Sequence, residues 1–151
     1  MIICFDFDGV IREGDQGIYH LGYNCSNKNV GPKAVYLQSA ASCRPLLNPL
    51  DFALPDDVIY VLSACTTVAE LNEKRAWLQH FYGYKVLFEH VFMGTANDVA
   101  KEKIELMESL HVEIYFENNP TIVNLMRKLT DKIKIVHYGS WVQEIKEKTE
   151  E

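Results

Sequence analysis

The sequence predicts an α/β protein with a doubly wound parallel sheet. Two short runs, residues 2–5 and 58–62, are continuously apolar, which is typical of strands buried on both faces of such a sheet. Segments with helical spacing of apolar residues lie between the expected strands, and this alternation indicates crossover units. The chain has 151 residues, enough for one domain with a sizeable core.

The first expected strand ends in two acidic residues. Residues 2–10 read Ile-Ile-Cys-Phe-Asp-Phe-Asp-Gly-Val. Side chains two positions apart in a strand point to the same side, so Asp6 and Asp8 can converge where the chain turns at Gly9. Such neighbouring carboxylates repel each other unless a cation neutralises them, and Mg²⁺ prefers oxygen ligands. The pattern predicts a ligand site at this strand end; the alternative is a solvated, Asp-rich turn.

Asp-Phe-Asp-Gly-Val resembles the first motif of the haloacid dehalogenase-like (HAD) superfamily, in which Mg²⁺-dependent phosphatases predominate. The resemblance implies a Rossmann-like domain over residues 1–142. It implies two catalytic residues: Asp6 as the nucleophile that attacks phosphorus, and Asp8 as the general acid and base. It also implies a small flap, at about residues 11–40, and no full cap domain. Residues 143–151 are expected to be a charged tail.

The next expected strand, Val58–Leu62, ends at Ser63. A hydroxyl at this place, followed by a helix, can bind a phosphate, and the arrangement resembles the second motif of the superfamily. Most strands end in a polar residue, which is the alternative interpretation. The following helix begins with a capping box, Thr67 to Glu70. Its inner face is predicted to contain Val68, Leu71, Leu78 and Phe81.

Residues 73–83 are similar to a stretch in the 5′(3′)-deoxyribonucleotidases of this superfamily. In those enzymes a Lys and a Trp precede a similar helix end. We interpret Trp77 as a packing residue rather than a substrate contact.

The third motif of the superfamily is a lysine near the start of a helix. Asn97 is expected to cap a helix that ends near Leu110, whose inner face contains Ala100, Ile104, Met107 and His111. Lys103 lies beside that face, and a buried ammonium needs a charged partner. The resemblance gives Lys103 the phosphate-binding role, with Lys101 as the alternative. A lysine that extends along the surface is the other interpretation.

The fourth motif is normally an apolar strand that ends in two aspartates. Here residues 112–117 alternate in polarity and lead into Glu117-Asn118, which carries one negative charge fewer. Asn119 is expected to cap a helix that begins at Pro120, and residues 133–137 are the last expected strand. The resemblance implies a metal site formed by Asp6, Asp8, Glu117 and Asn118. It implies that Ser63 and Lys103 bind the phosphate.

Composition limits the partners that we expect. The net charge is −6 and the pI is about 5.4, which argues against an extended surface for nucleic acid or an anionic membrane. The sequence has no apolar stretch of membrane-spanning length and no signal peptide pattern. The four cysteines show no metal-ligand spacing and fit a reducing compartment, so a cytoplasmic location is expected. The sequence does not indicate the oligomeric state.

The resemblance implies a Mg²⁺-dependent phosphomonoester hydrolase that acts through an aspartyl-phosphate. The expected substrate is a nucleotide or another small phosphorylated metabolite. The alternatives are a polynucleotide 3′-phosphatase, a transferase whose acceptor is not water, and a non-catalytic phosphate-binding protein on the same scaffold.

Overall fold

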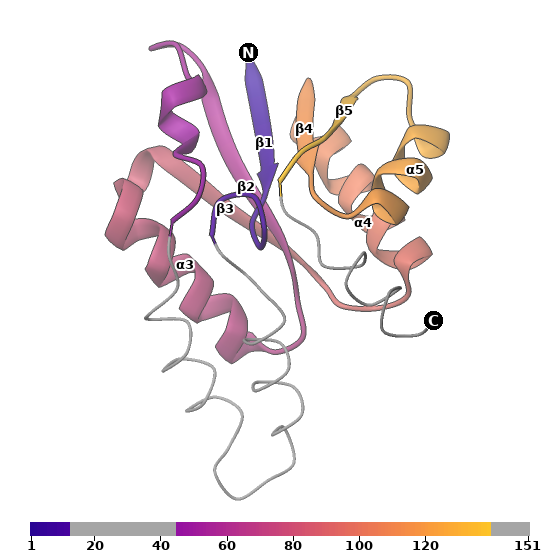
Figure 1. Ribbon diagram of the computed structural model, residues 1–151, viewed down its shortest axis with the longest axis horizontal. Helices are drawn as coiled ribbons and strands as arrows, with labels where there is room; N and C mark the ends of the chain where they lie inside the picture. The colour runs from indigo at the N-terminus through magenta and orange to yellow at the C-terminus, as the bar shows by residue number, and fades with distance from the viewer. Residues whose placement is uncertain (13–44, 140–151) are drawn as a thin grey trace, which may run out of the picture.

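A computed structural model describes residues 1–12 and 45–139 of the chain. Within these ranges the strands form one sheet in the order β3-β2-β1-β4-β5, and all neighbouring strands are parallel (Figure 1). This confirms the predicted α/β class. The strands are β1 (Ile2–Asp6), β2 (Val58–Cys65), β3 (Val86–Phe92), β4 (Ile114–Glu117) and β5 (Lys134–His137).

Helices cover the two faces of the sheet separately. The α-helices are α3 (Val68–Tyr82), α4 (Ala96–Ser109) and α5 (Pro120–Leu129), and the short 3-10 helices are η1 (Pro49–Phe52) and η2 (Gly83–Lys85). Trp77 and Leu78 of α3 pack with Phe5 of β1. Helices α4 and α5 pack on the opposite face, where Cys4 of β1 lies. The sheet is therefore doubly wound, with β1 at its centre.

Alternation along the strands sorts the side chains between the two layers. Phe5 of β1 and Phe7, directly after the strand, pack in the α3 layer, whereas Cys4 packs in the layer of α4 and α5. By the same period of two, Asp6 follows Cys4 toward the α4 layer. On β4, Tyr115 belongs to the α4 layer. Strand β1 ends at Asp6, so Asp8 no longer follows this alternation and contacts Lys74 of α3 on the other side of the sheet. This strand end lies at the switch point of the sheet, between β1 and β4.

The boundaries of α4 differ from the prediction. The cap is Thr95 instead of Asn97, because the Thr95 Oγ1 atom accepts a hydrogen bond from the Asp98 N–H at 3.1 Å. Ala100 and Met107 are buried as expected, but His111 is exposed. The helix has ended by then, and His111 has a φ of 61°, so its side chain no longer continues the helical face.

The inner face of α3 also differs from the prediction. Thr67 caps the helix as expected, since its Oγ1 atom accepts a hydrogen bond from the Glu70 N–H at 3.1 Å. Val68 and Phe81, however, are exposed, being 60% and 43% accessible. The buried residues of the helix are Glu70, Leu71, Glu73, Lys74, Trp77 and Leu78. Half of this face is charged, so a search for apolar periodicity recovers only part of it.

Several further expectations concern the end of β2 and segments outside the described residues. Strand β2 continues to Cys65, so Ser63 lies inside the strand rather than after it. Most of the expected flap (residues 11–40) and all of the expected tail (143–151) lie outside the described residues. Within the described ranges, no helix has the length and apolar character needed to cross a membrane. Cys4 and Cys65 are buried free thiols.

The predicted cap of α5 is present and gives a first testable consequence. The Asn119 Oδ1 atom accepts hydrogen bonds from the N–H groups of Thr121 (2.9 Å) and Ile122 (3.3 Å), directly ahead of Pro120. Replacing Asn119 by Ala should lower the free energy of unfolding by about 1 kcal/mol, because two donors at the helix start lose their acceptor. Urea denaturation would measure this loss, and an unchanged midpoint would contradict the capping role.

Candidate active site

The buried charges of the described residues gather at the carboxyl end of β1. Five acidic and three basic side chains are buried there, and each takes part in a contact with another of the group. They are Asp6, Asp8, Arg12, Glu70, Glu73, Lys74, Lys103 and Glu117. Burying a charge is costly unless it is paired. The eight residues form two groups, one around Lys103 and one around Lys74 and Arg12, which we treat as the two halves of a site. Together they contain five carboxyl groups and three basic groups.

One half of the site lies on the α4 side of the sheet. The Lys103 ammonium donates hydrogen bonds to Asp6 Oδ1 (3.0 Å), Tyr115 Oη (2.8 Å) and Glu117 Oε1 (3.2 Å). The Tyr115 hydroxyl in turn donates to Glu117 Oε1 at 2.7 Å. Lys103 is only 2% exposed, whereas Lys101 is exposed. Of the two candidate lysines, Lys103 is therefore the one beside Asp6.

The electrostatics of this half favour an additional cation. Burial, and next the charge of Glu117, hold the pKa of Asp6 well above its usual value, although Lys103 opposes them. Burial would also raise the pKa of Glu117, but Lys103 and hydrogen bonds outweigh it and lower that pKa. Burial lowers the pKa of Lys103, yet the two carboxylates raise it overall. A further positive charge near Asp6 would favour its ionised form.

The other half of the site lies on the α3 side. The Lys74 ammonium donates hydrogen bonds to Asp8 Oδ2 at 2.6 Å and to Ser63 Oγ at 2.8 Å. Its nitrogen also lies 3.6 Å from Glu70 Oε2. Lys74 thus joins the expected phosphate-binding hydroxyl to the expected general acid. Asp6 and Asp8, two residues apart in the chain, contact different lysines from opposite helical layers.

Arg12 completes the α3 half. Its guanidinium is fully buried and donates through Nη1 to both carboxylate oxygens of Glu73, at 2.8 and 3.0 Å. Its Nη2 atom lies 3.6 Å from Asp8 Oδ1, and its Cζ atom lies 4.6 Å from the centre of the Phe7 ring. Burial raises the pKa of Glu73, and Arg12 opposes that shift.

Sequence reasoning missed five residues of this site. They are Arg12, Glu70, Glu73, Lys74 and Tyr115. For two of them the sequence offered a clue, because Glu73 and Lys74 lie in the stretch that is similar to the deoxyribonucleotidases. Another existed for Tyr115, which is two residues before Glu117 and so on the same face of β4. Arg12 lies in the stretch that was assigned to the flap, and no pattern marked it.

The site contains oxygen donors of the kind that Mg²⁺ prefers. The Asp6 and Glu117 carboxyl groups contact the same ammonium, and Asn118, which follows Glu117 in the chain, is buried. No three His, Cys, Asp or Glu side chains among the described residues are grouped as a metal site. Amide, main-chain or water oxygens would therefore have to supply the other ligands, as is common for Mg²⁺.

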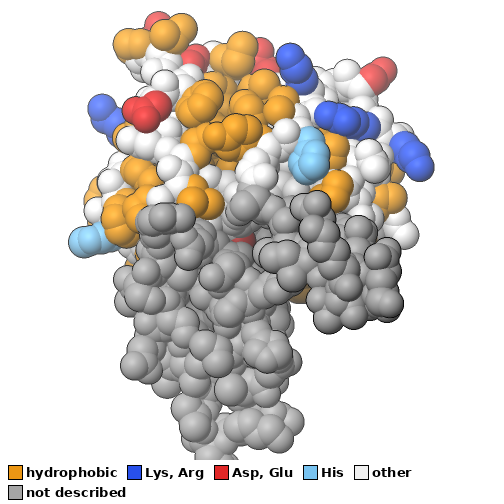
Figure 2. All heavy atoms as spheres, viewed as in Figure 1, with side chains coloured by type: hydrophobic (Ala, Val, Ile, Leu, Met, Phe, Trp, Pro, Cys, Tyr) orange, Lys and Arg blue, Asp and Glu red, His pale blue; other side chains and the backbone are white. Residues whose placement is uncertain are grey.

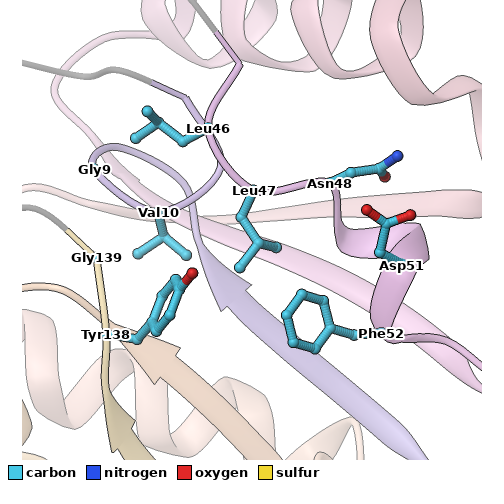
Figure 3. Close-up of a pocket in the computed structure, with 9 residues that line it drawn as sticks. All are labelled: Gly9, Val10, Leu46, Leu47, Asn48, Asp51, Phe52, Tyr138 and Gly139. Atoms are coloured by element: carbon cyan, nitrogen blue, oxygen red, sulfur yellow. The ribbon is translucent and has the colours of Figure 1, made fainter.

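A hollow beside the Gly9 loop is a separate feature. Val10, Leu47, Phe52 and Tyr138 point toward one another across it (Figure 3), and hydrophobic side chains gather on this side of the molecule (Figure 2). The residues that line it are Gly9, Val10, Leu46, Leu47, Asn48, Asp51, Phe52, Tyr138 and Gly139. Among the described residues that line it, there is no Lys or Arg and there is one acid, so these side chains do not favour a phosphate group.

Comparison with known proteins adds one distant structural likeness. No family model and no curated protein matches the sequence. The fold is similar to the HAD domain of the effector protein Lem4 from Legionella pneumophila, solved as an inactive mutant. The TM-score is 0.44 with 11% identity, over 97% of this chain and 91% of that one. A likeness at this level does not show a shared activity, so the function proposed below rests on the side chains described above.

Proposed function

We propose that this protein is a Mg²⁺-dependent phosphomonoester hydrolase. The observation that supports the proposal best is the pairing of Asp6 with Lys103 and of Asp8 with Lys74, with Ser63 hydrogen-bonded to Lys74. Two neighbouring carboxylates that contact different cations have different surroundings. They can therefore serve as nucleophile and as general acid.

In the proposed reaction, an oxygen of Asp6 attacks phosphorus while the bond from phosphorus to the leaving oxygen breaks. Asp8 gives its proton to that oxygen, and an aspartyl-phosphate forms. Asp8 then takes a proton from water, which attacks the phosphorus and releases phosphate and Asp6. Lys74, Ser63 and Lys103 neutralise charge on the transferring group. Mg²⁺ held by Asp6, the Asp8 carbonyl, Glu117 and Asn118 would add to that neutralisation.

The substrate that we propose is a small phosphorylated metabolite, with a nucleotide as the first choice. The chain carries a net charge of −6, which disfavours a long polyanion more than a small anion because repulsion grows with the charge in contact. A panel of nucleotides, sugar phosphates and 3′-phosphorylated oligonucleotides would rank the classes. Preference for the oligonucleotides would favour a polynucleotide 3′-phosphatase.

The direct test is hydrolysis of p-nitrophenyl phosphate by the full chain, with Mg²⁺ and with a chelator. We expect turnover that depends on the metal. If inorganic phosphate binds in calorimetry but no ester is hydrolysed at any Mg²⁺ concentration, the protein is a phosphate-binding protein on this scaffold, and the proposal is wrong.

The unusual fourth motif predicts opposite effects for two variants. Asn118→Asp should lower the Mg²⁺ concentration that gives half-maximal rate, because it adds a negative ligand. Glu117→Gln should raise that concentration at least tenfold, about 1.4 kcal/mol of binding energy, because the site loses a carboxylate and the amide also perturbs Lys103. Metal titrations of the initial rate would measure both. An unchanged titration for Glu117→Gln would remove Glu117 from the metal site.

A further inference from the structure

Both oxygens of the Asp8 carboxylate face a cation that is anchored on α3. Lys74 contacts Oδ2 at 2.6 Å, and Arg12 faces Oδ1 at 3.6 Å. Each cation also contacts a glutamate of the same helix: Lys74 contacts Glu70, and Arg12 contacts Glu73. The orientation of Asp8 is thus restrained from two directions by one helix.

Core packing alone does not account for Arg12. A buried ion pair rarely stabilises a protein more than apolar side chains of the same size would, because desolvation offsets the attraction. The guanidinium is nonetheless fully buried, lies over the Phe7 ring and binds Glu73 through two hydrogen bonds. Both bonds to Glu73 come from one nitrogen, Nη1, and the second nitrogen, Nη2, faces Asp8 Oδ1 at 3.6 Å. The rigid guanidinium therefore links Glu73 to Asp8 through two different nitrogens.

The geometry points to Arg12 and Glu73 as positioning residues for Asp8. They hold its carboxyl group in the orientation that delivers a proton to the leaving oxygen. This inference rests on the proposed function. In the step concerned, the Asp6–phosphorus bond forms, the bond from phosphorus to the leaving oxygen breaks, and the Asp8 proton moves to that oxygen. Arg12 and Glu73 touch neither phosphorus nor the leaving group, so they act through Asp8.

A dependence on the leaving group distinguishes this role from a structural one. An alkyl phosphate needs a proton on its poor leaving oxygen, whereas p-nitrophenyl phosphate releases a stable anion. Arg12→Lys keeps the charge but has only one nitrogen, so it cannot contact Glu73 and face Asp8 through two separate nitrogens as the guanidinium does. We compare kcat/KM, which reports formation of the aspartyl-phosphate and not its hydrolysis, because Asp8 also serves as the base in the second step. We expect kcat/KM of this variant to fall about 100-fold on an alkyl phosphate, since a positioned acid contributes about that much, and less than about threefold on p-nitrophenyl phosphate.

Two further variants complete the test. Glu73→Gln keeps Arg12 but replaces the carboxylate that accepts its hydrogen bonds with a neutral amide. Its activity on the alkyl phosphate should fall selectively as well, but by a smaller factor. Arg75→Lys changes an exposed arginine of the same helix and should leave both rates unchanged. Circular dichroism and thermal unfolding would check that each variant folds. If Arg12→Lys does not fold, Glu73→Gln provides the comparison.

The outcomes distinguish the proposed hydrolase function from the positioning role of Arg12 and Glu73. A wild-type chain that hydrolyses neither ester contradicts the proposed function, and this inference with it. A wild-type chain that is active, with folded variants whose kcat/KM falls by equal factors on both esters or does not fall, contradicts the positioning role alone. A selective loss on the alkyl phosphate supports it.

Discussion

Replacing Asp6 by Asn is expected to reduce kcat for phosphomonoesters by about 10⁴-fold or more, because an amide cannot act as the nucleophile. The fold should persist. A carboxyl group whose pKa is raised on folding destabilises the native state at pH values above its unfolded pKa. Since the pKa of Asp6 is raised by burial and by Glu117, a neutral Asn should leave stability at pH 7 unchanged or higher.

The measurements for this variant are the initial rate at saturating substrate and Mg²⁺, and the thermal unfolding midpoint. Loss of activity at saturating Mg²⁺, together with an unchanged or higher midpoint, is the result that the proposed nucleophile role requires. Substantial phosphatase activity in a cleanly folded Asp6→Asn protein, above the level of a mock purification, would exclude the aspartyl-phosphate mechanism.

Replacing Lys103 by Met is expected to have the largest effect on stability. The ammonium contacts Asp6, Glu117 and Tyr115, and it is 2% exposed. Without it, two carboxylates remain buried beside each other with no cation between them. Breaking a buried pair by removing one partner typically costs about 3–5 kcal/mol. Activity should be lost as well, because the phosphoryl group loses a neutralising cation.

The same helix offers a matched control. Lys101→Met changes an exposed lysine two residues away and should alter the free energy of unfolding by less than about 0.5 kcal/mol. Urea denaturation of both variants, with and without Mg²⁺, would measure the difference. Equal stability of the two variants, with activity retained in both, would show that Lys103 is an ordinary surface lysine.

Local patterns in the sequence indicated where several residues of the site lie. The apolar run before Asp6 predicts a buried strand, and the period of two places Asp6 and Asp8 at its end. On α4, the helical period puts Lys103 beside the inner face, and the structure brings that residue to Asp6. Asn119 and Pro120 mark the start of α5 because a cap and its first helical residue are adjacent in sequence. Each of these inferences depends on residues that are neighbours in the chain.

The side-chain pairings on the α3 side of the site were decided by tertiary structure. Lys74 and Asp8 are 66 residues apart in sequence, and Arg12 and Glu73 are 61 apart. Apolar periodicity treats a charged residue as solvent-facing, so it could not recognise the charged inner face of α3. A lysine is buried only where charged or polar partners offset the free-energy cost of removing its ammonium from water. Lys74 meets such partners only when α3 packs against the sheet.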